Sequence, residues 1–271
     1  MGSRARYNAS AMDLRECCAT AGPRHPWEVS RAHFFRDRLV AHAILCPGIR
    51  VLDVGAGDGY LASVLLPRLR PDGAVLCYDA LYPTDVLERL RAQAAPELSF
   101  TNQRPDRAFD LVLLLDVLEH VADDCDLLAD VVRDLVRPGG FLVASVPAWP
   151  EFFTQHDRML GHHRRYRPAR LQQLLQQCDL TVVEQGGLFH SLLAVRGWEK
   201  LAELVRGILS RPSPESASAV ADTAVGRWQG RAWLTQAALS GLALDRAIGQ
   251  MCARAGVVLP GLSAWAIAKK P

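Results

Sequence analysis

Apolar and polar positions along the chain follow two periods, one typical of strands and one typical of helices. Short apolar runs predict buried strands over residues 50–54, 74–78, 98–101, 109–115, 141–146 and 180–184. The segments between them repeat apolar residues at helical spacing over 60–69, 84–94, 124–136 and 168–178. This alternation predicts an α/β fold, in which right-handed crossovers build a parallel sheet with helices on both faces.

Two further regions flank the alternating core. Helical spacing predicts a helix over 26–46 before the first strand. After the sixth strand the pattern predicts an amphipathic helix over 188–209, a Pro- and Ser-rich loop over 211–218, a helix over about 228–255 and a last strand over 262–268, beside the sixth. We therefore expect four parts, namely an N-terminal helical lid over 1–47, an α/β core over 48–187, a helical cap over 188–261 and the last core strand over 262–271.

Composition excludes several classes of protein. Hydrophobic residues make up 49% of the 271 residues, which is enough for a large core. The net charge of +2 gives no argument for a nucleic-acid partner, and no apolar run approaches the roughly 18 residues of a membrane span. Arg4 and Arg6 precede no apolar segment, so we expect no secretory signal. The 7 cysteines lack C-x-x-C spacing, which favours a reduced, cytoplasmic protein.

A glycine-rich turn follows the first predicted strand. Gly55, Gly57 and Gly59 alternate with Ala56 and an aspartate before a helix begins. Glycines permit positive φ and close approach of a ligand to the backbone, and a helix start offers free N–H groups. A dinucleotide fingerprint needs G-x-G-x-x-G, but the chain has Tyr at position 60. A tight turn without a ligand is the alternative.

The charges around this turn favour a zwitterionic ligand over a polyphosphate. Asp58 lies in the turn, where its carboxylate would repel a pyrophosphate. Asp53 precedes the turn and is placed to meet an ammonium group.

Two more carboxylates end later strands of the predicted sheet. Asp79 ends the second strand, about 20 residues after the last glycine, where a carboxylate can accept hydrogen bonds from ribose hydroxyls. Ala80 and Leu81 follow and could pack on an adenine face, although a solvated turn is the alternative. Asp116, followed by Val117, interrupts the apolar run that ends the fourth strand, so it must face solvent or a ligand.

Together these motifs resemble class I S-adenosylmethionine (SAM) dependent methyltransferases of the small-molecule type. The resemblance covers roughly residues 48–186 and rests on the glycine turn, Asp79, and the string from Phe109 through Asp116 to His120. It implies a Rossmann-like seven-stranded sheet with an antiparallel last strand, and SAM lying across the strand tips. The implied cofactor-binding residues are Asp53, Gly55, Ala56, Gly57, Gly59, Asp79, Ala80, Leu81, Asp116 and Val117. Family members often carry an aspartate after the third strand, and Asn102 or Gln103 stands there in this chain.

A loop over 154–167 gathers polar residues after the fifth strand. It contains His156, Asp157, His162, His163 and Tyr166. Three interpretations are open: an acceptor site with a histidine as general base and arginines for an anionic group, a divalent metal site, or a structural loop of ion pairs. We expect no metal, because no ligand pair has i, i+4 spacing on a firmly predicted helix. The candidate catalytic residues are His156, His162, His163, Tyr166 and, after the fourth strand, His120.

A second resemblance concerns the N-terminal segment. His25, Trp27 and Arg31, together with the 154–167 loop, are similar to a bacterial methyltransferase subgroup with a His-Trp-Trp-Phe-type motif. The resemblance implies that Trp27 and Arg31 form a lid over SAM, whereas ordinary helix packing is the alternative for Trp27. Pro26 and Glu28 leave the aromatic part of the motif half present.

These interpretations predict an enzyme that methylates a small-molecule acceptor, at oxygen ahead of nitrogen or carbon, in secondary, lipid or glycan metabolism. The helix over 188–209 could lie on a membrane or hold a lipid-like acceptor, but packing on its own domain is the simpler expectation. The rival functions are a non-catalytic SAM- or nucleoside-binding domain and an NAD-dependent oxidoreductase or epimerase. The sequence indicates neither the acceptor nor the oligomeric state.

Overall fold

The computed structural model describes residues 24–209, 230–255 and 257–271, and its centre is a seven-stranded sheet. The strand order is β3-β2-β1-β4-β5-β7-β6. Only β7 runs antiparallel, against both β5 and β6. The strands are β1 (Arg50–Val54), β2 (Ala74–Tyr78), β3 (Leu98–Thr101), β4 (Phe109–Leu115), β5 (Val136–Pro147), β6 (Thr181–Leu188) and β7 (Ser263–Lys269). This topology confirms the predicted seven-stranded α/β sheet with an antiparallel last strand.

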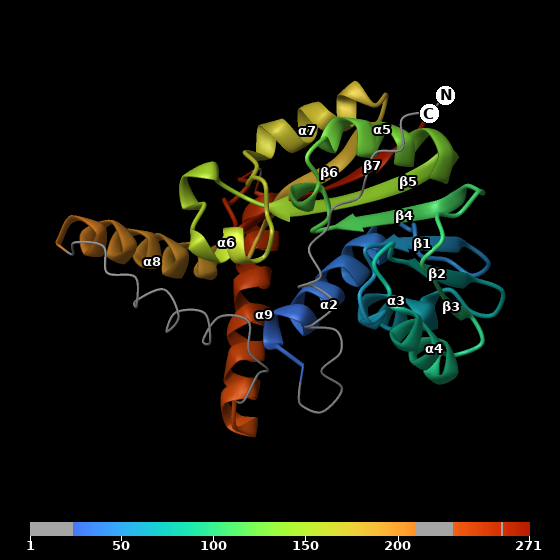
Figure 1. Ribbon diagram of the computed structural model, residues 1–271, viewed down its shortest axis with the longest axis horizontal. Coiled ribbons are helices and arrows are strands. Elements are labelled where there is room, and N and C mark those ends of the chain that lie inside the picture. Colours follow the sequence, from blue (N-terminus) through green and yellow to red (C-terminus); the bar gives the residue numbers. More distant parts are fainter. Residues whose placement is uncertain (1–23, 210–229, 256) are drawn as a thin grey trace.

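Helices cover both faces of the sheet (Figure 1). Successive residues of a strand point to opposite faces, so Leu111 and Leu113 of β4 pack in one core cluster and Val112 and Leu114 in the other. The first cluster includes side chains of α2 (Pro26–Ala41), α3 (Tyr60–Leu65) and α4 (Thr84–Gln93). The second includes side chains of α5 (Asp124–Leu135) and α7 (Pro168–Gln177). A strand buried on both faces explains why β4 is apolar without interruption from Leu111 to Leu115.

Two boundaries differ from the sequence prediction for local reasons. The first helix ends at Ala41 rather than at residue 46, because Ala43 adopts φ +54 and turns the chain so that Ile44 and Leu45 enter the core. Strand β5 begins at Val136, so the Pro138-Gly139-Gly140 segment lies within the strand rather than before it. Gly139 has φ +72, and the pairing of β4 with β5 shifts register at this point.

Two long helices lie between β6 and β7. They are α8 (His190–Leu209) and α9 (Ala232–Arg254), and the intervening residues 211–218 of the predicted loop lie outside the described part of the chain. The carboxylate of Asp245 in α9 accepts the backbone N–H groups of His190 and Ser191, at 3.0 and 2.6 Å. Helix α9 also packs against α2. The four-part division of the chain remains a prediction.

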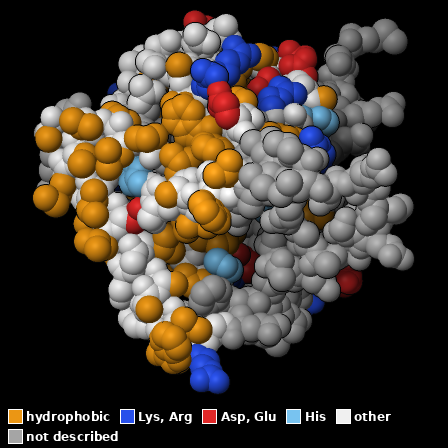
Figure 2. Space-filling view, turned by 90° about the vertical axis from the view of Figure 1, so that its left-hand side faces the viewer, with side chains coloured by type: hydrophobic (Ala, Val, Ile, Leu, Met, Phe, Trp, Pro, Cys, Tyr) orange, Lys and Arg blue, Asp and Glu red, His pale blue; other side chains and the backbone are white. Residues whose placement is uncertain are grey.

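The two helices leave apolar side chains exposed. Trp198 of α8 is 73% exposed, and Trp233 and Met251 of α9 are 65% and 67% exposed. Figure 2 shows hydrophobic side chains gathered on this end of the molecule. Within the described residues, none of the helices has the combination of length and apolar character that crossing a membrane requires.

Candidate active site

The glycine turn joins β1 to α3 at the carboxyl edge of the sheet. Gly55, Gly57 and Gly59 have φ values of +69, +56 and +74, a region that side chains rarely adopt. The N–H of Gly55 donates to the carbonyl of Tyr78 in β2 at 2.8 Å, and the hydroxyl of Tyr82 donates to the carbonyl of Gly57. These bonds fix the turn against the end of β2. Because glycine has no side chain, a ligand can approach the backbone of the turn closely.

Two buried carboxylates flank this turn. Asp53 in β1 is 4% exposed, and burial, opposed by Arg31 and reinforced by Asp79 and Asp58, raises its pKa to about 7. Asp79 after β2 is 8% exposed, and one of its carboxylate oxygens accepts the N–H of Leu81 at 2.9 Å. Asp79 is therefore held in one orientation at the strand tip.

A third carboxylate lies at the tip of β4. Asp116 has φ +56, and its carboxylate accepts the hydroxyl of Ser145 in β5 at 2.9 Å. Arg31 of α2 forms an ion pair with the same carboxylate, and its guanidinium lies 4.8 Å from the ring centroid of Trp27. Arg24, which precedes α2, pairs with Asp58 of the glycine turn. The segment from Arg24 to Arg31 therefore contacts two carboxylates, one in the glycine turn and one at the tip of β4, and its role as a lid stays a prediction.

The other predicted cofactor-binding residues lie close to these carboxylates along the chain but differ in exposure. Ala56 and Ala80 are half-buried, and Leu81 packs in part on the first core cluster. Val117 is 3% exposed and belongs to the second cluster, so its side chain has a packing role. Asn102 is exposed, and its amide nitrogen donates to the carbonyl of Tyr82 at 3.3 Å.

The loop after β5 is organised around the buried carboxylate of Asp157, in α6 (Gln155–Met159). This carboxylate accepts hydrogen bonds from the N–H and hydroxyl of Thr154 at 2.9 and 3.1 Å, from Nε of Arg165 at 2.8 Å and from Nδ1 of His162 at 3.1 Å. Burial alone would raise the pKa of Asp157, but the bond from His162 and the charge of Arg165 hold it well below its usual range. The ionised carboxylate of Asp157 therefore holds Thr154, His162 and Arg165 together in this loop.

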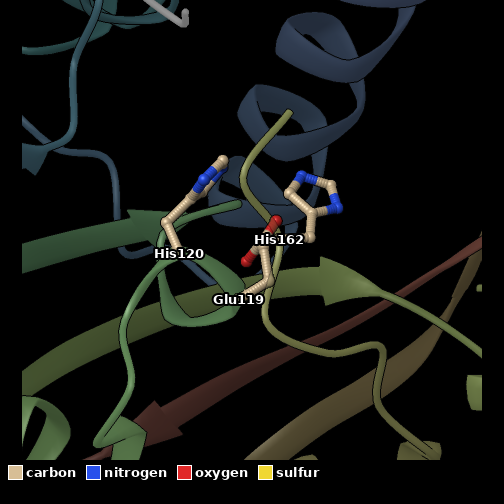
Figure 3. Close-up of side chains that lie close together, drawn as sticks. All are labelled: Glu119, His120 and His162. Atoms are coloured by element: carbon tan, nitrogen blue, oxygen red, sulfur yellow. The ribbon is translucent and has the colours of Figure 1, made fainter. Parts of the chain in front are cut away.

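The five candidate catalytic residues fall into different places. His120, at the end of η2 (Leu118–His120) after β4, is 5% exposed, and its ring lies edge-on to that of His162 with 4.7 Å between centroids. Glu119 lies beside them, 1% exposed (Figure 3). The side chain of His163 is exposed instead, while its N–H donates to the carbonyl of Glu119 at 2.7 Å.

His156 lies in α6, directly before Asp157. Burial, reinforced by the charge of Arg196, lowers the pKa of His156, so its imidazole is neutral near pH 7. Its Nδ1 is buried without a hydrogen-bond partner among the described residues.

Tyr166 packs in the second core cluster. Its side chain is 2% exposed, and its hydroxyl donates to Asp124 of α5 at 2.9 Å. Burial and the charge of Asp124 raise its pKa far above the usual range. Arg164 pairs with the same carboxylate at 3.0 Å. Tyr166 therefore ties the loop to α5, and its catalytic role stays a prediction.

Sequence reasoning did not identify three residues of the strand tips. Ser145 and Tyr82 contact the predicted site residues Asp116 and Gly57, and Arg24 contacts Asp58 of the glycine turn. Of the three, Ser145 could have been found from the sequence, because it lies near the end of an apolar strand and a buried hydroxyl needs a hydrogen-bond partner.

The sheet order with one antiparallel strand, and the glycine turn beside carboxylates at three strand tips, define a Rossmann-like fold of the methyltransferase type. Residues 29–185 match the family model described as a methyltransferase domain. The chain belongs to this family, the class I SAM-dependent methyltransferases.

Similar proteins agree with this assignment. The chain is 28% identical over 158 residues to a ubiquinone biosynthesis O-methyltransferase of Chelativorans sp. strain BNC1, covering 52% of this chain and 59% of that protein. It is 25% identical over 236 residues to one of Mesorhizobium japonicum, covering 73% of this chain and 89% of that protein. The Chelativorans protein and another curated relative, a probable SAM-dependent methyltransferase of Mycolicibacterium smegmatis, are matched over only 59% and 63% of their length.

A solved structure supports the fold. A protein from Galdieria sulphuraria, assigned as a sarcosine dimethylglycine methyltransferase, superposes with a TM-score of 0.54 at 17% identity, covering 89% of this chain and 86% of that one.

Proposed function

We propose that this chain transfers a methyl group from SAM to a small-molecule acceptor, at oxygen in preference to nitrogen or carbon. The observation that carries the proposal is the set of oriented carboxylates around a bare backbone turn. The O-methyltransferase relatives support oxygen as the acceptor atom.

The strand tips offer a separate partner for each part of SAM. Asp79, held by the N–H of Leu81, is the residue we assign to the ribose hydroxyls. The turn from Gly55 to Gly59 would take the methionine end, with Asp53 facing its ammonium group. The amide oxygen of Asn102 is the acceptor we assign to the adenine amine, since its amide nitrogen already donates to Tyr82. Ala56, Ala80 and Leu81 would line this pocket.

Arg31 and Trp27 would complete the binding site from α2. In the structure Arg31 pairs with Asp116 and stacks on Trp27, so both side chains already lie at the tip of β4. A guanidinium in this place can move from Asp116 to the carboxylate of a bound amino acid, because both are charge-assisted partners of the same kind.

Bound SAM supplies an electrophilic methyl group on a sulfonium, so the protein's main task is alignment. The imidazoles of His120 and His162, held edge-on at the end of β4 and the loop after β5, are the groups we assign to the acceptor side. A histidine there can take up the proton that an acceptor hydroxyl loses. His156 is a second candidate, because its Nδ1 is buried without a partner among the described residues.

Product analysis tests the proposal. Purified protein with SAM and a panel of phenols, carboxylic acids and amines should form S-adenosylhomocysteine and an acceptor heavier by one methyl group. Replacement of His162 by Gln should slow this turnover while SAM affinity stays within about two-fold, since a buried hydrogen bond lost outside the cofactor pocket costs binding little. SAM binding that survives with no transfer to any acceptor would favour the non-catalytic binding domain instead.

A further inference from the structure

Three side chains of metal-binding type converge from two loops beside the tip of β4. They are Glu119 and His120 of η2 and His162 of the loop after α6, and their ligand atoms all lie within 4.8 Å of one another. In Figure 3 the carboxylate and both imidazoles are directed toward the same small region. Glu119 and His120 are 1% and 5% exposed, and the side chain of His162 is 11% exposed. Only His162 of this group comes from the 154–167 loop, so the group differs from the metal site considered for that loop from the sequence.

The contacts of His162 orient it as a ligand. Its Nδ1 donates to the carboxylate of Asp157 at 3.1 Å, which leaves Nε2 as the nitrogen with a lone pair. A carboxylate behind a histidine in this way fixes the tautomer and increases the basicity of a metal-binding imidazole. Asp157 is itself immobile, because Thr154 and Arg165 donate to it and its side chain is fully buried.

The two loops are joined independently of the three side chains. The N–H of His163 donates to the carbonyl of Glu119 at 2.7 Å, so η2 and the loop after α6 keep a fixed spacing. Tyr166 and Arg164 fasten the same loop to Asp124 of α5. These bonds therefore keep the two segments in place without a bound metal ion.

We propose that Glu119, His120 and His162 bind one divalent transition-metal ion of the Zn²⁺ type beside the acceptor. Two imidazoles and one carboxylate form the donor set that Zn²⁺ and its neighbours prefer, whereas Mg²⁺ and Ca²⁺ prefer oxygen alone. Three protein ligands leave a coordination position open, as in catalytic rather than structural sites.

The open position gives the site a chemical role, which rests on the proposed function. With both imidazoles bound to the ion, the cation takes over the part of the base, because an acceptor hydroxyl bound in the open position has a lowered pKa and loses its proton to solvent more easily. The resulting oxygen anion forms the bond to the methyl group as the sulfur–methyl bond breaks, which leaves a neutral thioether. The acceptor class would then be a hydroxyl compound, such as a phenol or an enol.

Metal binding can be tested on the full chain without any acceptor. Protein treated with a chelator and then with Zn²⁺ should retain one metal ion per chain after gel filtration, measured by elemental analysis. Glu119→Gln and His162→Gln should each weaken binding by about ten-fold or more, whereas His163→Gln, at the exposed neighbouring histidine, should bind as the wild type does. Retention of metal by both of the first two variants would overturn the site, as would wild-type protein that retains none.

Two further measurements keep the result independent of folding and of the proposed function. Co²⁺ added to the wild type should give the visible absorption bands of a site with imidazole and carboxylate ligands, and their absence would count against the proposal even if the variants misfold. SAM titration of the same metal-free samples separates the two ideas. SAM binding without metal binding overturns the metal site alone, whereas metal binding without SAM binding overturns the proposed function alone.

Discussion

Replacement of Gly59 by Ala tests the construction of the glycine turn. Gly59 has φ +74, so an added side chain costs about 1–2 kcal/mol through the left-handed backbone. The new Cβ would also lie 2.6 Å from Cζ of Phe100, a ring that is 5% exposed and packs edge-on against Tyr82. Such overpacking adds about 1–3 kcal/mol. We expect the free energy of unfolding to fall by about 2–5 kcal/mol, a large share of the roughly 5–15 kcal/mol of a typical domain.

Denaturant unfolding with matched controls measures this loss. Gly48 and Gly139 also have positive φ, +85 and +72, but an added Cβ at either would meet no heavy atom within 4 Å. Gly48→Ala and Gly139→Ala should therefore lose only the backbone part, about 1–2 kcal/mol. The changed entropy of the unfolded chain is common to all three variants and cancels in the comparison. A loss for Gly59→Ala equal to that of the controls would refute the predicted clash with Phe100.

Three further predictions concern the carboxylates and Tyr166. Asp79→Ala should weaken SAM binding by about 1–3 kcal/mol in calorimetry, and unchanged affinity would remove Asp79 from the ribose site. The pKa of Asp53 is raised to about 7 in the folded state, so wild-type stability should fall as pH rises from about 4 to 7 relative to Asp53→Asn. Parallel stability curves of the two proteins would contradict that shift. Tyr166→Phe should lower the free energy of unfolding by about 1–3 kcal/mol but leave the pH profile of turnover unmoved, whereas a shifted profile would support a catalytic role for Tyr166.

Much of the fold could be predicted because its signals are local. Strands β1 to β4 match their predicted bounds, since each is a short apolar run closed by a turn or a polar residue. The last strand was expected beside the sixth and pairs with it, but it also separates β6 from β5. Strand β6 extends to Leu188, past the predicted end at residue 184, because pairing with β7 rather than apolar patterning forms its second half.

In the candidate site, too, the local features could be predicted and the contacts between distant residues could not. The positive φ of Gly55, Gly57 and Gly59 follows from local spacing, and this part could be predicted. The ion pair of Arg31 with Asp116 joins residues 85 positions apart, and the approach of His162 to Glu119 depends on how the loop after β5 folds back. The hydrogen bond of Tyr166 to Asp124 could not be predicted, because Asp124 lies in a helix 42 positions earlier in the chain.

The central claim is that the strand tips bind SAM. Calorimetric titration of the full chain with SAM, S-adenosylhomocysteine and NAD tests it most directly, because the rival interpretations differ in the ligand they require. The account predicts saturable binding of SAM and S-adenosylhomocysteine and no measurable binding of NAD. Tight binding of NAD with none of SAM would contradict it.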